Sequence, residues 1–352
     1  MSPAAHRAVV APATWPRPEP AADRLLVVDG DRLEHATFGD LPRLLAPGDL
    51  VVVNDAATLP ASLHGTARGE RVELRLAAGD LPSGEVTAVL FGAGDFRTRT
   101  EDRPPPPPLE RGDALAFDGL AAEIASVDPA EPRLVRVRFD RRGAALLGAV
   151  DRAGRPVQYA HVAEPLPLWH AQTPFAARPW AFELPSAGRP LTAAILRELG
   201  LRGVAVESVT HAAGLSSTGE PRLDARLPLP ERFDVPERTV RAVARARARG
   251  GAVVAIGTSV VRALEGAAAA TGELRAGAGE TDWLGSASTE LSVCDGIVTG
   301  VHAPGESHFE LLQAFAPHAA LERARDEAAR AGYLAHEFGD AMWIRASDRE
   351  PL

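Results

Sequence analysis

The stretch "VVAIGTSVVRALEG", residues 253–266, contains the change of pattern that best indicates the fold. Its first four residues are apolar and predict a buried strand, residues 257–259 form a polar break, and residues 260–266 are typical of the start of a helix. A strand that ends in Gly-Thr-Ser and turns at once into a helix brings small hydroxyls and backbone N–H groups to one point. We therefore expect this turn to bind a ligand.

The same alternation of strand and helix continues through the second half of the chain. Thr192 is expected to cap one helix and Gly200 to stop it, and Pro236 is expected in the first turn of another helix. Such alternation is typical of a three-layer α/β domain, with helices on both faces of one sheet. The expected elements are a helix at 191–200, a strand at 203–211, a helix at 235–251, the strand and helix of 253–266, an extended segment at 290–302, helices from about 307 and at about 319–331, and a strand at 341–345.

Residues 61–150 have a different pattern. Short segments, several of them alternating apolar and polar residues, are separated by Gly, Pro and Asp at a spacing of roughly 8 to 12 residues, which favours an antiparallel barrel or a small sandwich. Two strand-like runs at 24–29 and 49–55 resemble the α/β pattern instead. We therefore expect a discontinuous three-layer α/β domain, residues 1–60 and 151–352, with an antiparallel β-barrel inserted at 61–150.

Two proline-rich segments are expected to be irregular. Residues 1–22 are rich in Pro and Ala, and five prolines stand at 104–108 inside the expected barrel. The second run would suit a proline-binding module. A stiff loop between two strands is the interpretation that we favour.

The composition is that of an ordinary soluble protein. Of the 352 residues, 45% are apolar and 24% charged, and 38 Lys and Arg against 47 Asp and Glu give a net charge of −9, which argues against bulk binding of nucleic acid but leaves room for a local basic face. The single cysteine, Cys294, excludes an internal disulfide and a zinc site built on thiolates. No run reaches about 18 apolar residues, and residues 1–20 lack the apolar core of a signal peptide. We expect a cytoplasmic protein that does not span a membrane.

Polar side chains stand at the ends of four expected strands. In an open α/β sheet, ligands bind outside the carboxyl ends of the strands. Any one of these groups is well explained as a local cap. Because four strand ends share the feature, a common ligand site is the better interpretation. The four groups are Asn54 with Asp55, Thr210 with His211, Thr258 with Ser259, and Thr299 to His302.

Several common site motifs are absent from the sequence. It has neither a phosphate-binding G-x-x-x-x-G-K-[ST] nor a G-x-G-x-x-G after a strand, which disfavours a nucleoside triphosphate or NAD. It also lacks H-E-x-x-H and G-x-S-x-G, and the spacing of His302 and His308 is poor for ligands on a helix, so we expect no metal and no serine hydrolase. "GETDW", residues 279–283, is expected to be a solvated loop when taken by itself.

A row of arginines is the one candidate for binding nucleic acid. The four recur at steps of three and four residues in the expected helix 235–251 and so share one face. Such a stripe suits a phosphate backbone. In a chain this acidic, a solvated outer face is the simpler explanation. The residues are Arg238, Arg241, Arg245 and Arg249.

An ordered set of segments extends from about residue 22 to residue 345. The segments are "ADRLLVVD", "PGDLVVVNDAATLPASL", "LPSAGRPLT", "VTHAAG", "VVAIGTSVVRALE", "GETDW", "VHAPGESHFELLQAF" and "GYLAHEFGDAMWI". In their joint order and spacing they resemble the S-adenosylmethionine:tRNA ribosyltransferase-isomerase family of queuosine biosynthesis.

The resemblance implies an α/β domain that carries an inserted barrel. It also implies transfer of the ribosyl part of S-adenosylmethionine to a 7-aminomethyl-7-deazaguanine base in tRNA, with isomerisation to an epoxy-cyclopentane and release of adenine and methionine. A sulfonium acidifies the adjacent C5′ hydrogens, so a general base can start the rearrangement, and the departing adenine needs a general acid. S-adenosylmethionine is then a co-substrate, tRNA is the partner, and no metal is required. We further expect a monomer.

The resemblance also implies where the site lies. It matches family histidines at His211 and His302, whose imidazoles are candidates for proton transfer because they titrate near neutral pH. Glu265 is a third candidate catalytic residue, and Glu265 and Asp340 are candidates to bind ribose hydroxyls or the sulfonium. The candidate substrate-binding residues are Asn54, Asp55, Gly188, Thr192, Gly257, Thr258, Ser259, Arg262, Glu280, Thr281, Asp282, Gly339 and Asp340.

Several motif positions depart from the family's pattern. Pro190 stands in place of a histidine, Ala57 in place of an arginine and Glu306 in place of a lysine, and Val260 lacks a hydroxyl. These changes remove groups suited to binding phosphate or transferring protons. Two other functions therefore stay open beside the family's reaction: transfer to a different, small-molecule acceptor, and binding without catalysis.

Overall fold

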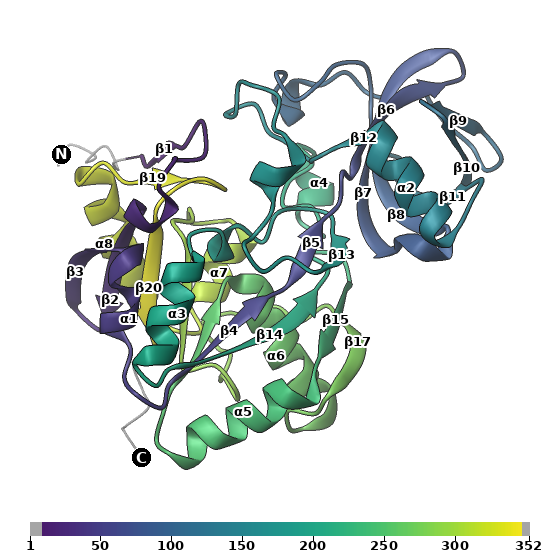
Figure 1. Ribbon diagram of the computed structural model, residues 1–352. Helices are drawn as coiled ribbons and strands as arrows, with labels where there is room; N and C mark the ends of the chain where they lie inside the picture. The colour runs from purple at the N-terminus through teal and green to yellow at the C-terminus, as the bar shows by residue number, and fades with distance from the viewer. Residues whose placement is uncertain (1–8, 347–352) are drawn as a thin grey trace.

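The computed structural model describes residues 9–346, and Figure 1 shows a large sheet with helices on both faces beside a separate barrel. The first eight residues of the expected irregular lead-in therefore lie outside the described residues. The rest of that lead-in includes a two-residue strand, β1 (Ala11–Pro12), which pairs with β19 (Leu334–Ala335), and a 3-10 turn at Pro20–Ala22. This pairing holds the start of the described chain against its carboxyl-terminal part.

The central sheet has nine strands within the described residues, and four neighbouring strands in it run parallel. These are β14, β4, β16 and β18, with antiparallel pairs on both sides. Parallel neighbours bring their carboxyl ends to the same edge of a sheet. In spatial order the strands are β17 (Gly277–Thr281), β15 (Glu231–Val235), β14 (Ala205–His211), β4 (Leu50–Asn54), β16 (Val253–Ile256), β18 (Gly296–Gly300), β20 (Ala341–Arg345), β2 (Arg24–Asp29) and β3 (Arg32–Thr37).

Helices cover both faces of this sheet because its central strands are apolar on both sides. In β4, Leu50 and Val52 pack into one core cluster, whereas Val51 and Val53 pack into a second cluster on the opposite face. The prediction of a three-layer α/β architecture is confirmed. One layer contains α5 (Glu237–Ala248), α6 (Thr258–Thr271), α7 (Ser307–Leu312) and α8 (His318–Arg330), and the other contains α1 (Leu41–Leu44) and α3 (Ala193–Leu201).

The inserted antiparallel barrel is confirmed as well. Six strands of the described chain form it, and it closes because β9 pairs with β6. Helix α2 (Gly143–Ala153) packs Leu146 and Val150 into the barrel core, and the prolines at 104–108 lie in the loop between β8 and β9. The domain limits at residues 60 and 150 stay a prediction. The strands are β6 (Ser62–Ala67), β7 (Glu70–Asp80), β8 (Glu85–Phe91), β9 (Ala114–Phe117), β10 (Leu120–Val127) and β11 (Leu134–Phe139).

Local contacts move several of the expected element boundaries. Thr192 caps α3 as expected, but Gly200 lies inside that helix rather than stopping it. Pro236 is the residue before α5 rather than part of its first turn. The segment expected to extend from residue 290 forms a strand only from Gly296, because backbone N–H groups just before it bind a buried carboxylate. None of the described helices is long and apolar enough to cross a membrane.

Buried charges link the barrel to the α/β part of the chain. Glu73 forms ion pairs with Arg75 and Arg103, all three nearly inaccessible. Burial alone would raise the pKa of Glu73, but the two guanidinium groups outweigh it and bring the value to about 2. The Arg75 guanidinium also lies 5.4 Å from the centre of the Tyr159 ring, a distance at which a cation attracts an aromatic face. The barrel thereby helps to position Tyr159, which lines the cavity described next.

Candidate active site

A cavity of about 900 Å³ opens at the carboxyl edge of the parallel strands. Strands β14, β16 and β18 contribute the wall at their ends, through His211, the Gly-Thr-Ser turn and residues 299–302. The structure thus brings together strand ends that are up to about a hundred residues apart in the sequence. The remaining lining includes the loops at 99–101, 159–161, 183–187, 213–217, 305–308 and 335–337.

Asn54, at the end of β4, connects that strand to β14 and to α6, although it does not line the cavity. Its Oδ1 accepts the backbone N–H groups of Ala56 at 3.0 Å and His211 at 2.9 Å. Its Nδ2 donates to the carbonyl of His211 at 3.0 Å and to the hydroxyl of Ser259 at 3.2 Å. The end of β4 is therefore fixed to the end of β14 and to the first turn of α6, and its predicted contact with substrate stays a prediction.

The turn into α6 requires glycine. Gly257 has φ +92°, in the left-handed region that other residues rarely adopt, and a Cβ there would lie 3.2 Å from the Cβ of Ala187. None of the side chains that the structure describes caps the amino end of α6. Since Gly257, Thr258 and Ser259 all line the cavity, the positive end of the helix dipole faces it. The turn therefore favours a negatively charged group, and the ligand binding that we expect there stays a prediction.

His302 lies in the cavity wall with both ring nitrogens engaged. Its Nε2 is 3.0 Å from Thr299 Oγ1, and its Nδ1 is 3.6 Å from Glu306 Oε2. Burial opposes the charge on Glu306, but the neighbouring His302 prevails and brings the pKa of Glu306 to about 2. The His308 ring stacks on His302 at 4.8 Å, and burial lowers the pKa of His308 to about 3. The ring of His302 is therefore oriented by fixed partners, as a proton-transfer group must be.

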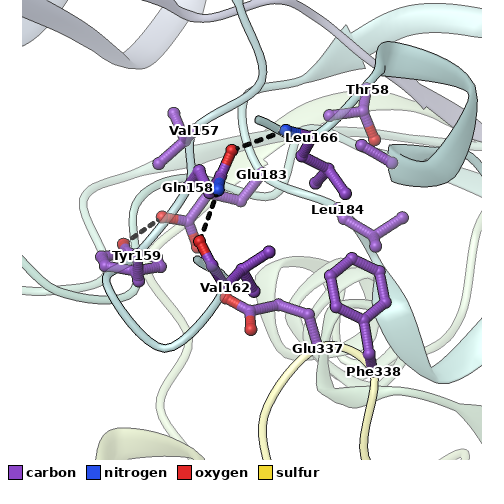
Figure 2. A pocket seen from close by; sticks show the side chains of 11 residues that line it. Thr58, Val157, Gln158, Tyr159, Val162, Leu166, Glu183, Leu184, Glu337 and Phe338 are labelled. Atoms are coloured by element: carbon purple, nitrogen blue, oxygen red, sulfur yellow. Dashed lines mark hydrogen bonds between the residues drawn. The ribbon is translucent and has the colours of Figure 1, made fainter. Parts of the chain in front are cut away.

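Glu183 is a second candidate for proton transfer, and the sequence patterns do not point to it. It lines the cavity and accepts a hydrogen bond from the Tyr159 hydroxyl. Burial raises the pKa of Glu183 to about 7. Figure 2 shows this pair beside a smaller cavity of about 20 Å³, which Glu337 and Phe338 also line. A carboxyl that titrates near neutral pH suits a general acid.

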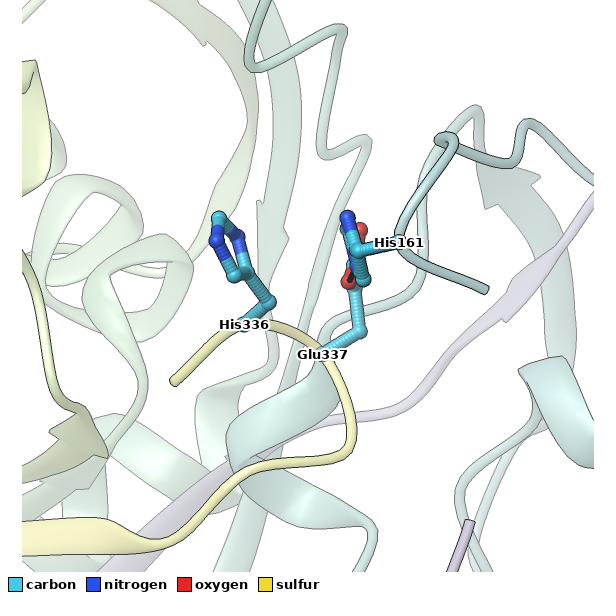
Figure 3. A group of neighbouring side chains, drawn as sticks. All are labelled: His161, His336 and Glu337. Carbon is cyan, nitrogen blue, oxygen red and sulfur yellow. Dashed lines mark hydrogen bonds and ion pairs between the residues drawn. The ribbon is translucent and has the colours of Figure 1, made fainter. Parts of the chain in front are cut away.

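His161, His336 and Glu337 form a third titratable group in the cavity wall, shown in Figure 3. His161 Nε2 lies 2.7 Å from Glu337 Oε2, and the His161 ring stacks on that of His336 at 4.4 Å with an angle of 24° between planes. One ligand atom from each residue lies within 4.8 Å of the others, close enough to hold a metal ion. The two rings are stacked with nearly parallel planes, however, so an ion in the plane of one ring would lie outside the plane of the other, and ligation by both would require a ring to rotate.

Asp340 fixes the loop that carries His336 and Glu337. Its carboxylate accepts the backbone N–H groups of Arg24 and Leu334, both at 2.8 Å, and pairs with the Arg17 guanidinium at 2.6 Å. The side chain is only 1% exposed and is not part of the cavity lining. Its described contacts are structural, and its predicted contact with ribose or sulfonium stays a prediction.

Other predicted site residues also lie outside the cavity lining. Asp55 accepts the hydroxyls of Ser208 and Thr210, and Gly188 packs so closely on Phe175 that a Cβ would lie 2.7 Å from its ring. The prediction that "GETDW" forms a loop is wrong in part. Its first three residues end strand β17, which pairs with β15. The residues outside the lining are Asn54, Asp55, Gly188, Thr192, Glu265, Glu280, Thr281, Asp282, Gly339 and Asp340.

Glu265 has its carboxylate fully occupied by one loop. Oε1 accepts the backbone N–H groups of Val293 at 2.9 Å and Cys294 at 2.8 Å. Oε2 accepts the backbone N–H of Ser292 at 2.9 Å and its hydroxyl at 2.8 Å. Because the side chain is 2% exposed and none of its oxygens is free for substrate, these contacts favour a structural role over the catalytic role that the resemblance implies.

Replacing Glu265 tests that role. Glu265→Gln keeps the shape of the side chain but leaves only one oxygen to accept from the four donors, where the carboxylate has two. We therefore expect the free energy of unfolding to fall by about 1–3 kcal/mol. Urea unfolding followed by circular dichroism measures the change. The matched control is Glu273→Gln, an exposed carboxylate just beyond the same helix, which should change stability by less than about 0.5 kcal/mol. Equal stability of the two variants would rule out the structural role.

Sequence reasoning missed three groups that the fold adds to the cavity. Glu183, Glu231 and the pair His161–Glu337 lie in the lining but far from one another in the sequence. Glu337 stands within a quoted motif segment, which was a usable signal. Glu183 directly precedes the quoted segment "LPSAGRPLT", and Glu231 begins an alternating strand, but neither pattern marks the carboxylate as part of a site.

The chain matches the model of a known family over residues 10–344, almost the entire described part, and that family is described as "Queuosine biosynthesis protein". The S-adenosylmethionine:tRNA ribosyltransferase-isomerase of Anaeromyxobacter dehalogenans (strain 2CP-C) is 36% identical over 318 residues, which is 88% of each chain. The protein of the same name from Azoarcus sp. (strain BH72) is 35% identical over 95% of this chain and 93% of its own.

A solved structure agrees with these relatives. The crystal structure of S-adenosylmethionine tRNA ribosyltransferase from Thermotoga maritima superposes with a TM-score of 0.52 at 25% identity. The match covers 94% of this chain and 95% of that one, so it includes both the sheet and the barrel. On the family match and the identity to these relatives, the chain belongs to the queuosine biosynthesis protein family.

Proposed function

We propose that this chain transfers and isomerises the ribosyl group of S-adenosylmethionine onto a 7-aminomethyl-7-deazaguanine base in tRNA, with release of adenine and methionine. The observation that carries the proposal is the cavity at the carboxyl edge of the parallel strands, which gathers His302, Glu183 and the amino end of α6 in a member of this family. At about 900 Å³ it is at the upper end of the usual range for small-molecule sites, roughly 300–1,000 Å³. S-adenosylmethionine together with a flipped-out base is a ligand of that size class.

The cavity offers groups for both proton transfers. The reaction starts by removal of a C5′ proton beside the sulfonium, and adenine leaves more readily when an acid protonates its ring. We assign the base to His302, whose Nδ1 stays beside Glu306 while Nε2 gives up its contact with the Thr299 hydroxyl to take the proton, and the acid to Glu183. His211 is not assigned as the base, because burial lowers its pKa to about 4.

Two of the departures from the family's pattern leave the cavity intact. Val260 is completely buried on the side of α6 that packs into the core. The missing hydroxyl is therefore not one that faced the ligand. Glu306 lines the cavity and pairs with His302, which gives the reversed charge a partner. The relatives quoted above carry the name of the tRNA reaction, and so favour it over a small-molecule acceptor or binding without catalysis.

The reaction is proposed to need no metal. The sulfonium already activates the C5′ hydrogens, and the His161–Glu337 contact at 2.7 Å gives each group a partner without an ion. The protein is further proposed to be a cytoplasmic monomer, consistent with a tRNA substrate.

Turnover tests the proposal directly. Purified protein is incubated with S-adenosylmethionine, EDTA and tRNA transcripts that carry or lack the 7-aminomethyl-7-deazaguanine base, and products are measured by mass spectrometry. We expect adenine and methionine in equal amounts, with the matching mass gain on the base, only with the base-containing tRNA. Absence of release contradicts the proposed reaction. Activity that EDTA abolishes and Zn²⁺ restores contradicts the metal-free part and makes His161, His336 and Glu337 the candidate ligands.

The pKa of Glu183 predicts the pH dependence of this turnover. As general acid the carboxyl must be protonated, so kcat should fall as pH rises above about 7, by tenfold per unit. Glu183→Gln should lower kcat by about 100-fold or more and remove this dependence. Glu198→Gln, on the surface of α3, is the matched control and should keep the wild-type profile. A Glu183→Gln variant that retains the decline at high pH would exclude Glu183 as the acid.

The arginine stripe on α5 is proposed to contact the tRNA backbone. All four arginines are exposed, although Arg238 pairs with Glu207 and Arg241 with Glu237. Reversing two charges, Arg245→Glu with Arg249→Glu, should weaken tRNA binding and reduce the slope of log K against log salt by about two. The control reverses Arg323 and Arg330 on α8, and equal losses in both double variants would mean that α5 has no specific part in binding.

A further inference from the structure

Three ionisable side chains are enclosed together in the cavity wall beside the amino end of α6. His211, Glu231 and Arg262 are 0%, 6% and 6% exposed, and all three line the cavity. Arg262 Nε lies 2.8 Å from Glu231 Oε2, and His211 Nε2 lies 3.3 Å from the same oxygen. Burying charges is costly unless each is paired and hydrogen-bonded, so the hydrogen bonds of this cluster need to be accounted for.

The hydrogen bonds of the cluster are incomplete. Glu231 Oε1 accepts the backbone N–H of Gly214 at 2.7 Å. Among the described residues, Glu231 Oε2, Arg262 Nε and Nη2, and both ring nitrogens of His211 have no hydrogen-bond partner. Arg262 and Glu231 therefore attract each other as charges, but the Nε–H bond does not point at the oxygen. Arg262 Nη2, a cationic donor, and Glu231 Oε2, an anionic acceptor, thus lie near each other in the cavity wall without a hydrogen bond among the described residues.

The neighbouring helix end adds further unused donors. The amino end of a helix leaves backbone N–H groups without intrahelical partners, and α6 has no side-chain cap there. Arg262 follows Thr258 by four residues, so its side chain leans back over the first turn, on the side of the helix that faces the cavity. The Arg262 guanidinium and the helix dipole thus favour a negative group at the same place.

We propose that this cluster binds the α-amino and α-carboxylate groups of the methionyl part of S-adenosylmethionine. The carboxylate lies between Arg262 Nη2 and the amino end of α6, and the ammonium donates to Glu231 Oε2. An α-amino acid presents an acceptor group and a donor group on one carbon, which matches Arg262 Nη2 next to Glu231 Oε2, since neither atom makes a hydrogen bond among the described residues. A phosphate satisfies only the arginine and meets repulsion from Glu231. The assignment rests on the proposed use of S-adenosylmethionine and names the part of the cavity that holds its amino-acid end.

Binding of three probes by calorimetry tests the assignment. The probes are S-adenosylmethionine, its decarboxylated form, which lacks only the carboxylate, and 5′-methylthioadenosine, which lacks the amino-acid end. Glu231→Gln keeps the oxygen that accepts from Gly214, and Arg262→Gln removes the charge. Arg325→Gln, another arginine of the cavity lining, is the matched control.

Arg262→Gln should weaken the binding of S-adenosylmethionine about 10- to 100-fold. The same variant should change the affinity for the decarboxylated form and for 5′-methylthioadenosine by less than about threefold. Glu231→Gln should weaken both amine-containing probes and spare 5′-methylthioadenosine, whose binding also shows that the variant is folded. Arg325→Gln should change the affinities for all three probes by the same factor.

Two results overturn the assignment. In one, Arg262→Gln leaves the affinity for S-adenosylmethionine unchanged. In the other, each variant weakens all three probes equally. If wild-type protein turns over S-adenosylmethionine in either case, only the assignment of the amino-acid end fails. Wild-type protein that binds none of the probes refutes the proposed function and this assignment with it.

Discussion

The side-chain amide of Asn54 is the contact on which the geometry of the cavity depends. Its two acceptor positions and two N–H donors are all used, by Ala56, by both backbone groups of His211 and by Ser259. An aspartate would lack the two donors, and a leucine would lack all four bonds. At this same point the chain leaves β4 for β5 (Ala56–Thr58) and the barrel. One amide therefore relates the end of two parallel strands, the start of α6 and the exit toward the barrel.

Buried carboxylates serve the surrounding loops in the same way. Glu265 holds residues 292–294 ahead of β18, and Asp340 holds the loop that carries His336 and Glu337. His336 has φ +67°, a conformation that costs a residue with a side chain of the order of 1–3 kcal/mol and that persists only when its surroundings enforce it. Several of the recognisable motif residues, Asn54, Glu265 and Asp340 among them, therefore fix the backbone around the cavity and do not line it.

Sequence patterns predicted the layers of the fold because burial on both faces leaves a direct trace in the chain. The apolar run of β4 predicted the parallel sheet, and the Gly-Thr-Ser turn after β16 lies in the wall of the cavity. The sequence pattern did not predict residues whose place in the cavity depends on contacts with distant parts of the chain. Glu231 is set opposite Thr281 by an antiparallel edge of the sheet, and Glu183 acquires its raised pKa from burial by loops that have no periodicity of their own. Neither effect can be read from neighbouring residues.

The central claim is that the carboxyl edge of β14, β4, β16 and β18 forms the binding site for S-adenosylmethionine. A crystal structure of the protein grown with saturating S-adenosylmethionine tests it most directly. The claim predicts the ligand inside the 900 Å³ cavity, with its amino-acid end beside Arg262 and Glu231 and its ribose toward His302. Ligand density confined to another surface, with this cavity filled only by solvent, would contradict the account.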